Sequence, residues 1–295
     1  VRTVCVRSAK WLFEMLLNCR QKPILCREEN KMQATPLNLL CIGDVVGPAA
    51  VDYLGKNLWA LRQEYAADFV VVNAENAAAG NGTDPETARA LFASGADVLT
   101  GGNHSFQKRS FYEYLEGEPR ALRPANYTAA CPGSGYGIFD CRGYRLLCIN
   151  VSGTAFMQPI ACPFETVEKI LARESGGYDF ALLDIHAEAT SEKIALAHAF
   201  DGKISVIYGT HTHVQTADER ILSRGTGYLT DLGMTGCEQD SVLGVRADCI
   251  IDFLRTKMPC RFLPAEGTVS LHGALFSIDP ETAKVTSVRR IAKAE

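Results

Sequence analysis

The stretch that decides the fold is "KISVIYGTHTH", residues 203–213. An apolar run rich in β-branched residues predicts a strand, and a glycine and two histidines follow it. Side chains two positions apart in an extended segment point to the same side. We therefore expect His211 and His213 to leave the strand end together. Chance is one interpretation of this pair, and a shared positively charged ligand is the other.

Similar strands recur along the chain and alternate with segments of helical spacing. The expected strands are 37–43, 68–76, 96–104, 144–153, 178–188 and 203–213, and the expected helices are 51–61, 83–95, 163–177 and 190–200. Alternating strands and helices imply crossover connections and largely parallel pairing. The tail is different, because residues 261–291 are β-rich with an expected hairpin turn at 279–284. The pattern predicts one α/β domain with two sheets and outer helices.

One helix start in this pattern has a specific capping signal. In residues 83–95, Thr83 and Glu86 have the spacing of a capping box, and Pro85 stands in the first turn. Gly95 is the expected stop. We expect the helix to begin just after Thr83.

Composition excludes several classes of protein. The 295 residues are 47% apolar with a net charge of −4, and no run of about 18 apolar residues predicts a membrane span. The sequence has no dominant basic stripe, which argues against an extended nucleic-acid surface. Eleven cysteines occur without a C-x-x-C pair, mostly inside apolar stretches. A reducing, cytoplasmic location is therefore expected.

The amino-terminal segment differs from the rest in charge. Residues 1–33 carry seven Lys or Arg against three Asp or Glu, a balance of +4, which leaves −8 for the remainder. We expect 1–33 to be an extension outside the fold and 34–295 to be the domain. Deleting residues 1–31 should accordingly leave folding and activity intact.

Polar residues gather where five of the expected strands end. In open α/β sheets the ligand crevice lies beyond the carboxyl ends of the strands. Carboxylates, amides and neutral imidazoles are the mixed ligands of iron, manganese or zinc. Their number exceeds the four ligands of one tetrahedral ion, so two ions bridged by a carboxylate fit better. The residues are Asp44, Glu75, Asn76, Asn103, His104, His186, His211 and His213.

Other polar residues have more ordinary interpretations. His198 and His272 are interpreted as a common helix histidine and a common strand histidine. Asp184 and Asp231 could orient a ligand or serve only the fold. Lys108 and Arg109 follow a Gly-Gly pair, but the spacing of a nucleotide P-loop is absent.

Six blocks of the sequence together resemble one family. "IGDVVG", "NAEN", "GGNH", "DIHAE", "GTHTHVQTADERIL" and "GYLTDLGMTG" are similar to YmdB-type metallophosphoesterases, within the calcineurin-like phosphoesterases, from about Leu37 to Ile291. The resemblance implies a four-layer α/β/β/α sandwich with two metal ions, iron favoured and manganese the alternative. The larger group usually opens with Asp-x-His, whereas Asp44 is followed by two valines here, which matches the narrower family.

The resemblance also implies residue roles. Asp44, Asn76 and His213 would hold one ion. Asn103, His186 and His211 would hold the other. Glu75 would bridge the ions, and His104 would protonate the leaving oxygen after a hydroxide held between the ions attacks phosphorus.

The implied substrates are small phosphodiesters, above all 2′,3′-cyclic nucleotides. The loop "VSGTAFM", which we expect to border the substrate, departs from the family's usual Met-Gly pair. A nucleotide phosphomonoesterase and a non-catalytic nucleotide- or RNA-binding regulator are the alternatives. The sequence leaves open whether the chain forms a homo-oligomer.

Overall fold

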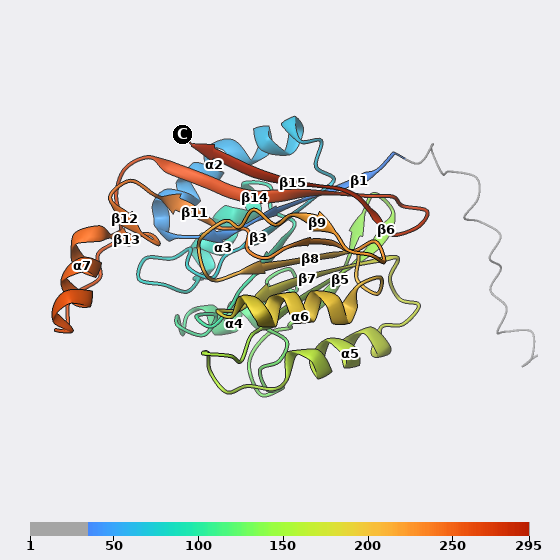
Figure 1. The fold of residues 1–295 in the computed structure, drawn as a ribbon, viewed down its shortest axis with the longest axis horizontal. Helices are drawn as coiled ribbons and strands as arrows, with labels where there is room; N and C mark the ends of the chain where they lie inside the picture. Colours follow the sequence, from blue (N-terminus) through green and yellow to red (C-terminus); the bar gives the residue numbers. More distant parts are fainter. Residues whose placement is uncertain (1–34, 295) are drawn as a thin grey trace, which may run out of the picture. The chain divides into compact units, whose positions relative to one another are not determined.

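The computed structural model describes residues 35–294 of the chain. The expected extension, residues 1–33, lies outside this range. Within it, two β-sheets carry helices on their outer faces (Figure 1). No helix of residues 35–294 has the length and apolar character needed to cross a membrane.

The first sheet has seven strands in the order β2-β11-β14-β1-β3-β4, with β15 beside β14. Strands β1, β3 and β4 run parallel, whereas β14 and β15 form an antiparallel hairpin across the expected turn. This arrangement confirms both the parallel core and the β-rich tail. The bounds are β1 Leu37–Ile42, β2 Asp44–Val45, β3 Phe69–Asn73, β4 Val98–Thr100, β11 Met234–Cys237, β14 Val269–Ile278 and β15 Val285–Ala294.

The second sheet has six strands in the order β5-β6-β7-β8-β10-β9. Its four central strands are parallel, and β5 and β9 are antiparallel edges. A separate hairpin, β12–β13, precedes the last helix. The bounds are β5 Tyr136–Cys141, β6 Tyr144–Ser152, β7 Phe180–His186, β8 Val206–Thr210, β9 Arg220–Ile221, β10 Gly227–Leu229, β12 Ser241–Val242 and β13 Val245–Arg246.

The helices are α2 Gly47–Glu64, α3 Pro85–Ala93, α4 Phe111–Gly117, α5 Pro163–Arg173, α6 Thr190–Phe200 and α7 Ala247–Thr256. The start of α3 differs from the expectation. Its N-cap is Asp84, whose side chain accepts from the backbone of Thr87, while the Thr87 hydroxyl closes the box. Thr83 instead donates its hydroxyl hydrogen to the carbonyl of Ala74. The capping-box assignment to Thr83 and Glu86 was therefore wrong by one residue.

The strands alternate their side chains between two apolar clusters. In β1, Leu39 and Cys41 pack toward the second sheet, whereas Leu40 and Ile42 pack in the cluster that includes α2. This is the period-two pattern of a strand buried on both faces. The second sheet packs its other face against α5 and α6 (Figure 1). The carboxyl ends of the parallel strands are thereby held in a fixed frame.

Candidate metal centre

All eight predicted residues lie near each other at strand ends. Asp44 begins β2, just after the end of β1, and Glu75 and Asn76 follow β3. Asn103 and His104 follow β4, His186 is the last residue of β7, and His211 and His213 follow β8. Two sheets thus supply this cluster, because β7 and β8 belong to the second sheet and the other strands to the first.

His104 is fixed by Glu75. The backbone N–H of His104 donates to Glu75 Oε1 at 2.6 Å, and His104 Nδ1 lies 3.0 Å from the same oxygen. The ring also lies 2.9 Å from Asn76 Oδ1. The hydrogen bond that the His104 ring donates to Glu75 raises the pKa of His104, because the carboxylate stabilises the imidazolium. Its side chain keeps 31% exposure, so the ring can meet a ligand from solvent.

His186 is held at the centre of the cluster. Its Nε2 lies 3.0 Å from Asn103 Oδ1 and 3.1 Å from His211 Nδ1. A Cβ on Gly102 would collide with the His186 ring, so the second glycine of "GGNH" makes room for this histidine. Burial holds the pKa of His186 well below its usual value, and the neutral ring therefore offers one nitrogen lone pair.

The two histidines after β8 leave the strand differently from the expectation. Strand β8 ends at Thr210, and His211 and His213 have φ values of 100° and 62°. The extended continuation predicted through residue 213 was wrong, because the chain turns through the left-handed region. The turn lets the His211 N–H donate to Asp44 Oδ2 at 3.0 Å. It also brings His213 Nε2 to 3.4 Å from Asn76 Nδ2.

A buried network of hydrogen bonds around Asp184 supports His186. Asp184 accepts hydrogen bonds from Thr100 at 2.5 Å, Thr210 at 2.8 Å and Asn73 at 3.0 Å. The Thr210 hydroxyl also lies 3.0 Å from His186 Nδ1. Burial raises the pKa of Asp184 to about 7. Asp184 therefore positions the histidine through Thr210, which favours the orienting role over a role in the fold alone.

The loop between His211 and His213 is supported by Asp231, for which the sequence left both an orienting role and a role in the fold open, and by Lys193, which the sequence did not reveal. Asp231 accepts from the Thr212 N–H at 3.2 Å and from its hydroxyl at 2.7 Å. The Lys193 ammonium from α6 donates to the same carboxylate at 2.7 Å. Both charged side chains are essentially inaccessible to solvent. Asp231 thus connects a buried lysine to the histidine loop.

Two buried carboxylate oxygens test whether the cluster suits a metal. Within residues 35–294, Asp44 Oδ1 and Glu75 Oε2 have no hydrogen-bond partner. Burial raises the pKa of Asp44 to about 6 and also raises that of Glu75. A cation would satisfy both oxygens and favour the charged carboxylates. The donor set therefore fits divalent ions.

In the described part of the chain, no group of three or more His, Cys, Asp or Glu side chains could hold an ion as it stands. His211 Nε2 instead lies 3.1 Å from Glu188 Oε2.

Two sheets with donors at their facing strand ends define a mixed α/β fold of the metallophosphoesterase and nucleotidase class. A NAD nucleotidase from Haemophilus influenzae shares this fold at a TM-score of 0.53, 16% identity, and coverage of 88% of this chain and 56% of that one. The chain belongs to the YmdB-like protein family, whose family model matches residues 40–291.

Two relatives are similar over most of their length. A 2′,3′-cyclic-nucleotide 2′-phosphodiesterase from Bacillus subtilis is 40% identical over 255 residues, 86% of this chain and 96% of the relative. The crystal structure of a novel phosphatase from Mycoplasma pneumoniae has a TM-score of 0.84 and 32% identity, covering 89% of this chain and 95% of that one.

Proposed function

We propose that this chain is a di-metal phosphodiesterase that hydrolyses 2′,3′-cyclic nucleotides. The observation that carries the proposal is the pair of orphaned carboxylate oxygens, Asp44 Oδ1 and Glu75 Oε2, buried among imidazole and amide side chains. The name of the 40% identical Bacillus subtilis relative supports the substrate class. Family membership supports divalent ions as cofactors.

The ligand sets follow the positions in the cluster. Asp44, Asn76 and His213 hold one ion in this proposal, supported by the 3.8 Å between Asp44 Oδ1 and His213 Nε2. Asn103, His186 and His211 hold the other ion. Glu75 would hold both ions, which is supported by the 3.5 Å between its Oε1 and His186 Nε2 and by its Oε2, which has no hydrogen-bond partner in residues 35–294.

The chemistry divides between the cofactor and the chain. When bound, a pair of divalent ions supplies an activated water and neutralises charge on the phosphoryl oxygens. His104 supplies the proton that the departing ribose oxygen needs as its bond to phosphorus breaks. Glu75 holds that imidazole in place through both the backbone and the ring. Because the His104 ring is partly exposed and Glu75 is buried, His104 can contact the substrate without itself being a metal ligand.

Finer features belong to the same proposal. We assign iron as the favoured metal and manganese as the alternative, because the mixed nitrogen and oxygen donors suit both.

The fold is the four-layer sandwich, and the domain begins near residue 34, supported by a compact unit that starts at Pro36 and a family match that starts at residue 40. Buried thiols such as Cys41 and Cys148 support a reducing, cytoplasmic location.

The test combines metal analysis with activity. The purified protein should contain two iron or manganese ions per chain and hydrolyse 2′,3′-cyclic AMP. Chelation should abolish this activity, and added metal should restore it. Faster hydrolysis of AMP than of the cyclic nucleotide would favour a phosphomonoesterase instead. Metal-independent nucleotide binding without turnover would overturn the enzyme and favour a binding protein.

A further inference from the structure

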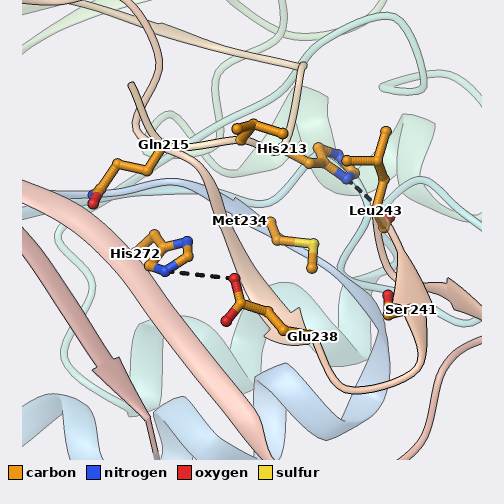
Figure 2. Close-up of a pocket in the computed structure, with 8 residues that line it drawn as sticks. His213, Gln215, Met234, Glu238, Ser241, Leu243 and His272 are labelled. Atoms are coloured by element: carbon orange, nitrogen blue, oxygen red, sulfur yellow. Dashed lines mark hydrogen bonds and ion pairs between the residues drawn. The ribbon is translucent and has the colours of Figure 1, made fainter. Parts of the chain in front are cut away.

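A cavity of about 380 Å³ lies beside the candidate metal centre, and Figure 2 shows its lining. It is walled by His213 and by residues of β11, β14 and the β12–β13 hairpin. His272 of β14, which the sequence had suggested was an ordinary strand residue, lines this cavity. The residues that matter below are His213, Met234, Glu238, Ser241, Leu243 and His272.

The cavity shares a wall with the metal ligands. Met234 pairs in register with Asp44 across β11 and β2. His213 Nδ1 donates to the Leu243 carbonyl at 3.1 Å, while its Nε2 faces Asn76. One imidazole therefore belongs both to the cavity wall and to the proposed metal centre, where the phosphate of the substrate would bind. A group attached to that phosphate through a ribose would reach the cavity.

The lining has the character of a site for a flat, polar-edged ring. Met234 and Leu243 give apolar surface, and Leu243 remains 46% exposed. Glu238 places a carboxylate in the cavity with 47% of its side chain exposed. Figure 2 shows this carboxylate facing His272, whose Nε2 lies 3.6 Å away. Apolar walls with a few placed polar groups are typical of small-molecule sites.

The polar groups of the cavity are unevenly available. The Gln215 amide donates to three backbone carbonyls, those of Leu232, Gly273 and Ile291, so it is committed to the fold. The Ser241 hydroxyl accepts from the Gly244 N–H. Glu238 is thus the principal acceptor that a ligand would meet.

We propose that this cavity is the nucleobase subsite of the enzyme and that Glu238 selects bases with amino donors, guanine above all, over uracil. The proposal rests on the proposed function. Adjacent N1–H and amino donors of guanine match the two oxygens of a carboxylate, a charge-assisted bidentate pairing. Uracil instead flanks its single N–H with two carbonyl oxygens that a carboxylate repels. Glu238 is a specificity residue, outside the reacting atoms.

The test separates the base from the reacting phosphate. We would measure kcat/KM for 2′,3′-cyclic GMP, 2′,3′-cyclic UMP and the base-free methyl riboside 2′,3′-cyclic phosphate. The guanosine substrate should exceed the uridine substrate about tenfold or more, as a charged hydrogen bond predicts. Glu238→Gln should remove this preference, and Leu243→Ala should lower both nucleotides relative to the base-free substrate. The matched control Glu281→Gln, an exposed carboxylate in the β14–β15 turn, should retain the preference.

Binding of free guanosine, followed by calorimetry on the metal-loaded protein, keeps the two proposals apart. Guanosine binding that weakens in Glu238→Gln, without any turnover of the three substrates, supports the subsite and overturns the proposed function. Turnover with equal rates on all three substrates, or an unchanged preference in Glu238→Gln, overturns the subsite and leaves the phosphodiesterase standing.

Discussion

Replacing Lys193 by methionine should destabilise the protein strongly. The Lys193 ammonium donates to Asp231 at 2.7 Å, and neither side chain is accessible to solvent beyond 1%. The lysine stem packs against Gly209 of β8, where a Cβ would collide with it. Methionine keeps most of this apolar stem but removes the charge, so the substitution isolates the ion pair.

The expected size follows from burial. Removing one partner of a buried ion pair costs about 3–5 kcal/mol, because the remaining charge is left uncompensated. Asp231 would retain its bonds from Thr212 and the 2.8 Å bond from the Gly233 N–H. These neutral donors do not replace the ammonium charge. At about 2–4 °C per kcal/mol for a domain of this size, the melting temperature should fall by about 6–20 °C.

Urea unfolding followed by circular dichroism measures the free energy, and metal analysis supplies a second readout. The same loss should loosen the loop between His211 and His213 and lower the metal content. Lys169→Met is the matched control, since that lysine is 77% exposed beside Glu165, and it should change stability by less than about 0.5 kcal/mol. A loss below about 1 kcal/mol in Lys193→Met would refute the reasoning.

Three further substitutions or treatments have definite expectations. Gly102→Ala should displace the His186 ring and lower metal content, as metal analysis would show, because the new Cβ occupies the ring's place. His104→Ala should keep both metals and lower kcat by about 10²–10⁴-fold in steady-state assays, as loss of a general acid predicts. A thiol reagent at pH 8, followed by mass spectrometry, should modify exposed Cys162 and spare Cys148, because burial raises the pKa of the Cys148 thiol and blocks access.

Controls for these three are available in the same chain. Gly117→Ala should leave metal content unchanged, since within residues 35–294 no atom beyond its own helix backbone and chain neighbours lies within 4 Å of the place that its new Cβ would take. His198→Ala, at an exposed position of α6, should leave kcat unchanged. Metal loss in His104→Ala would reassign that residue from proton donor to ligand. Labelling of Cys148 in the folded protein would contradict its burial.

Local patterns in the sequence were sufficient to predict most elements and the residues that meet at the strand ends. The helix expected at residues 190–200 forms over those same residues, and the helix expected at 163–177 ends at Arg173, near its glycines. Strand ends could be located because apolar runs stop abruptly before polar residues such as Glu75 and Asn103. Because the carboxyl ends of parallel strands lie at one edge of a sheet, the sequence also predicted that those side chains would lie close together.

Features that depend on distant partners could not be predicted in this way. Lys193 and Asp231 are separated by 38 positions, and a lysine in a helix ordinarily faces solvent. His272 reaches the cavity because β14 pairs with β11 beside β2. The cap lies at Asp84 and not at the expected Thr83, because the Thr83 hydroxyl donates to the carbonyl of Ala74 at the start of the same loop.

The left-handed turn after β8 also places catalytic activity and thermal stability in conflict. His211 and His213 both adopt positive φ values, and such backbone conformations cost about 1–3 kcal/mol each for residues other than glycine. Replacing His211 by glycine should therefore raise the melting temperature while removing a proposed metal ligand. Laboratory selection for heat resistance alone would favour chains that have lost this histidine. Selection for turnover would retain it, and the two regimes would drive the same position in opposite directions.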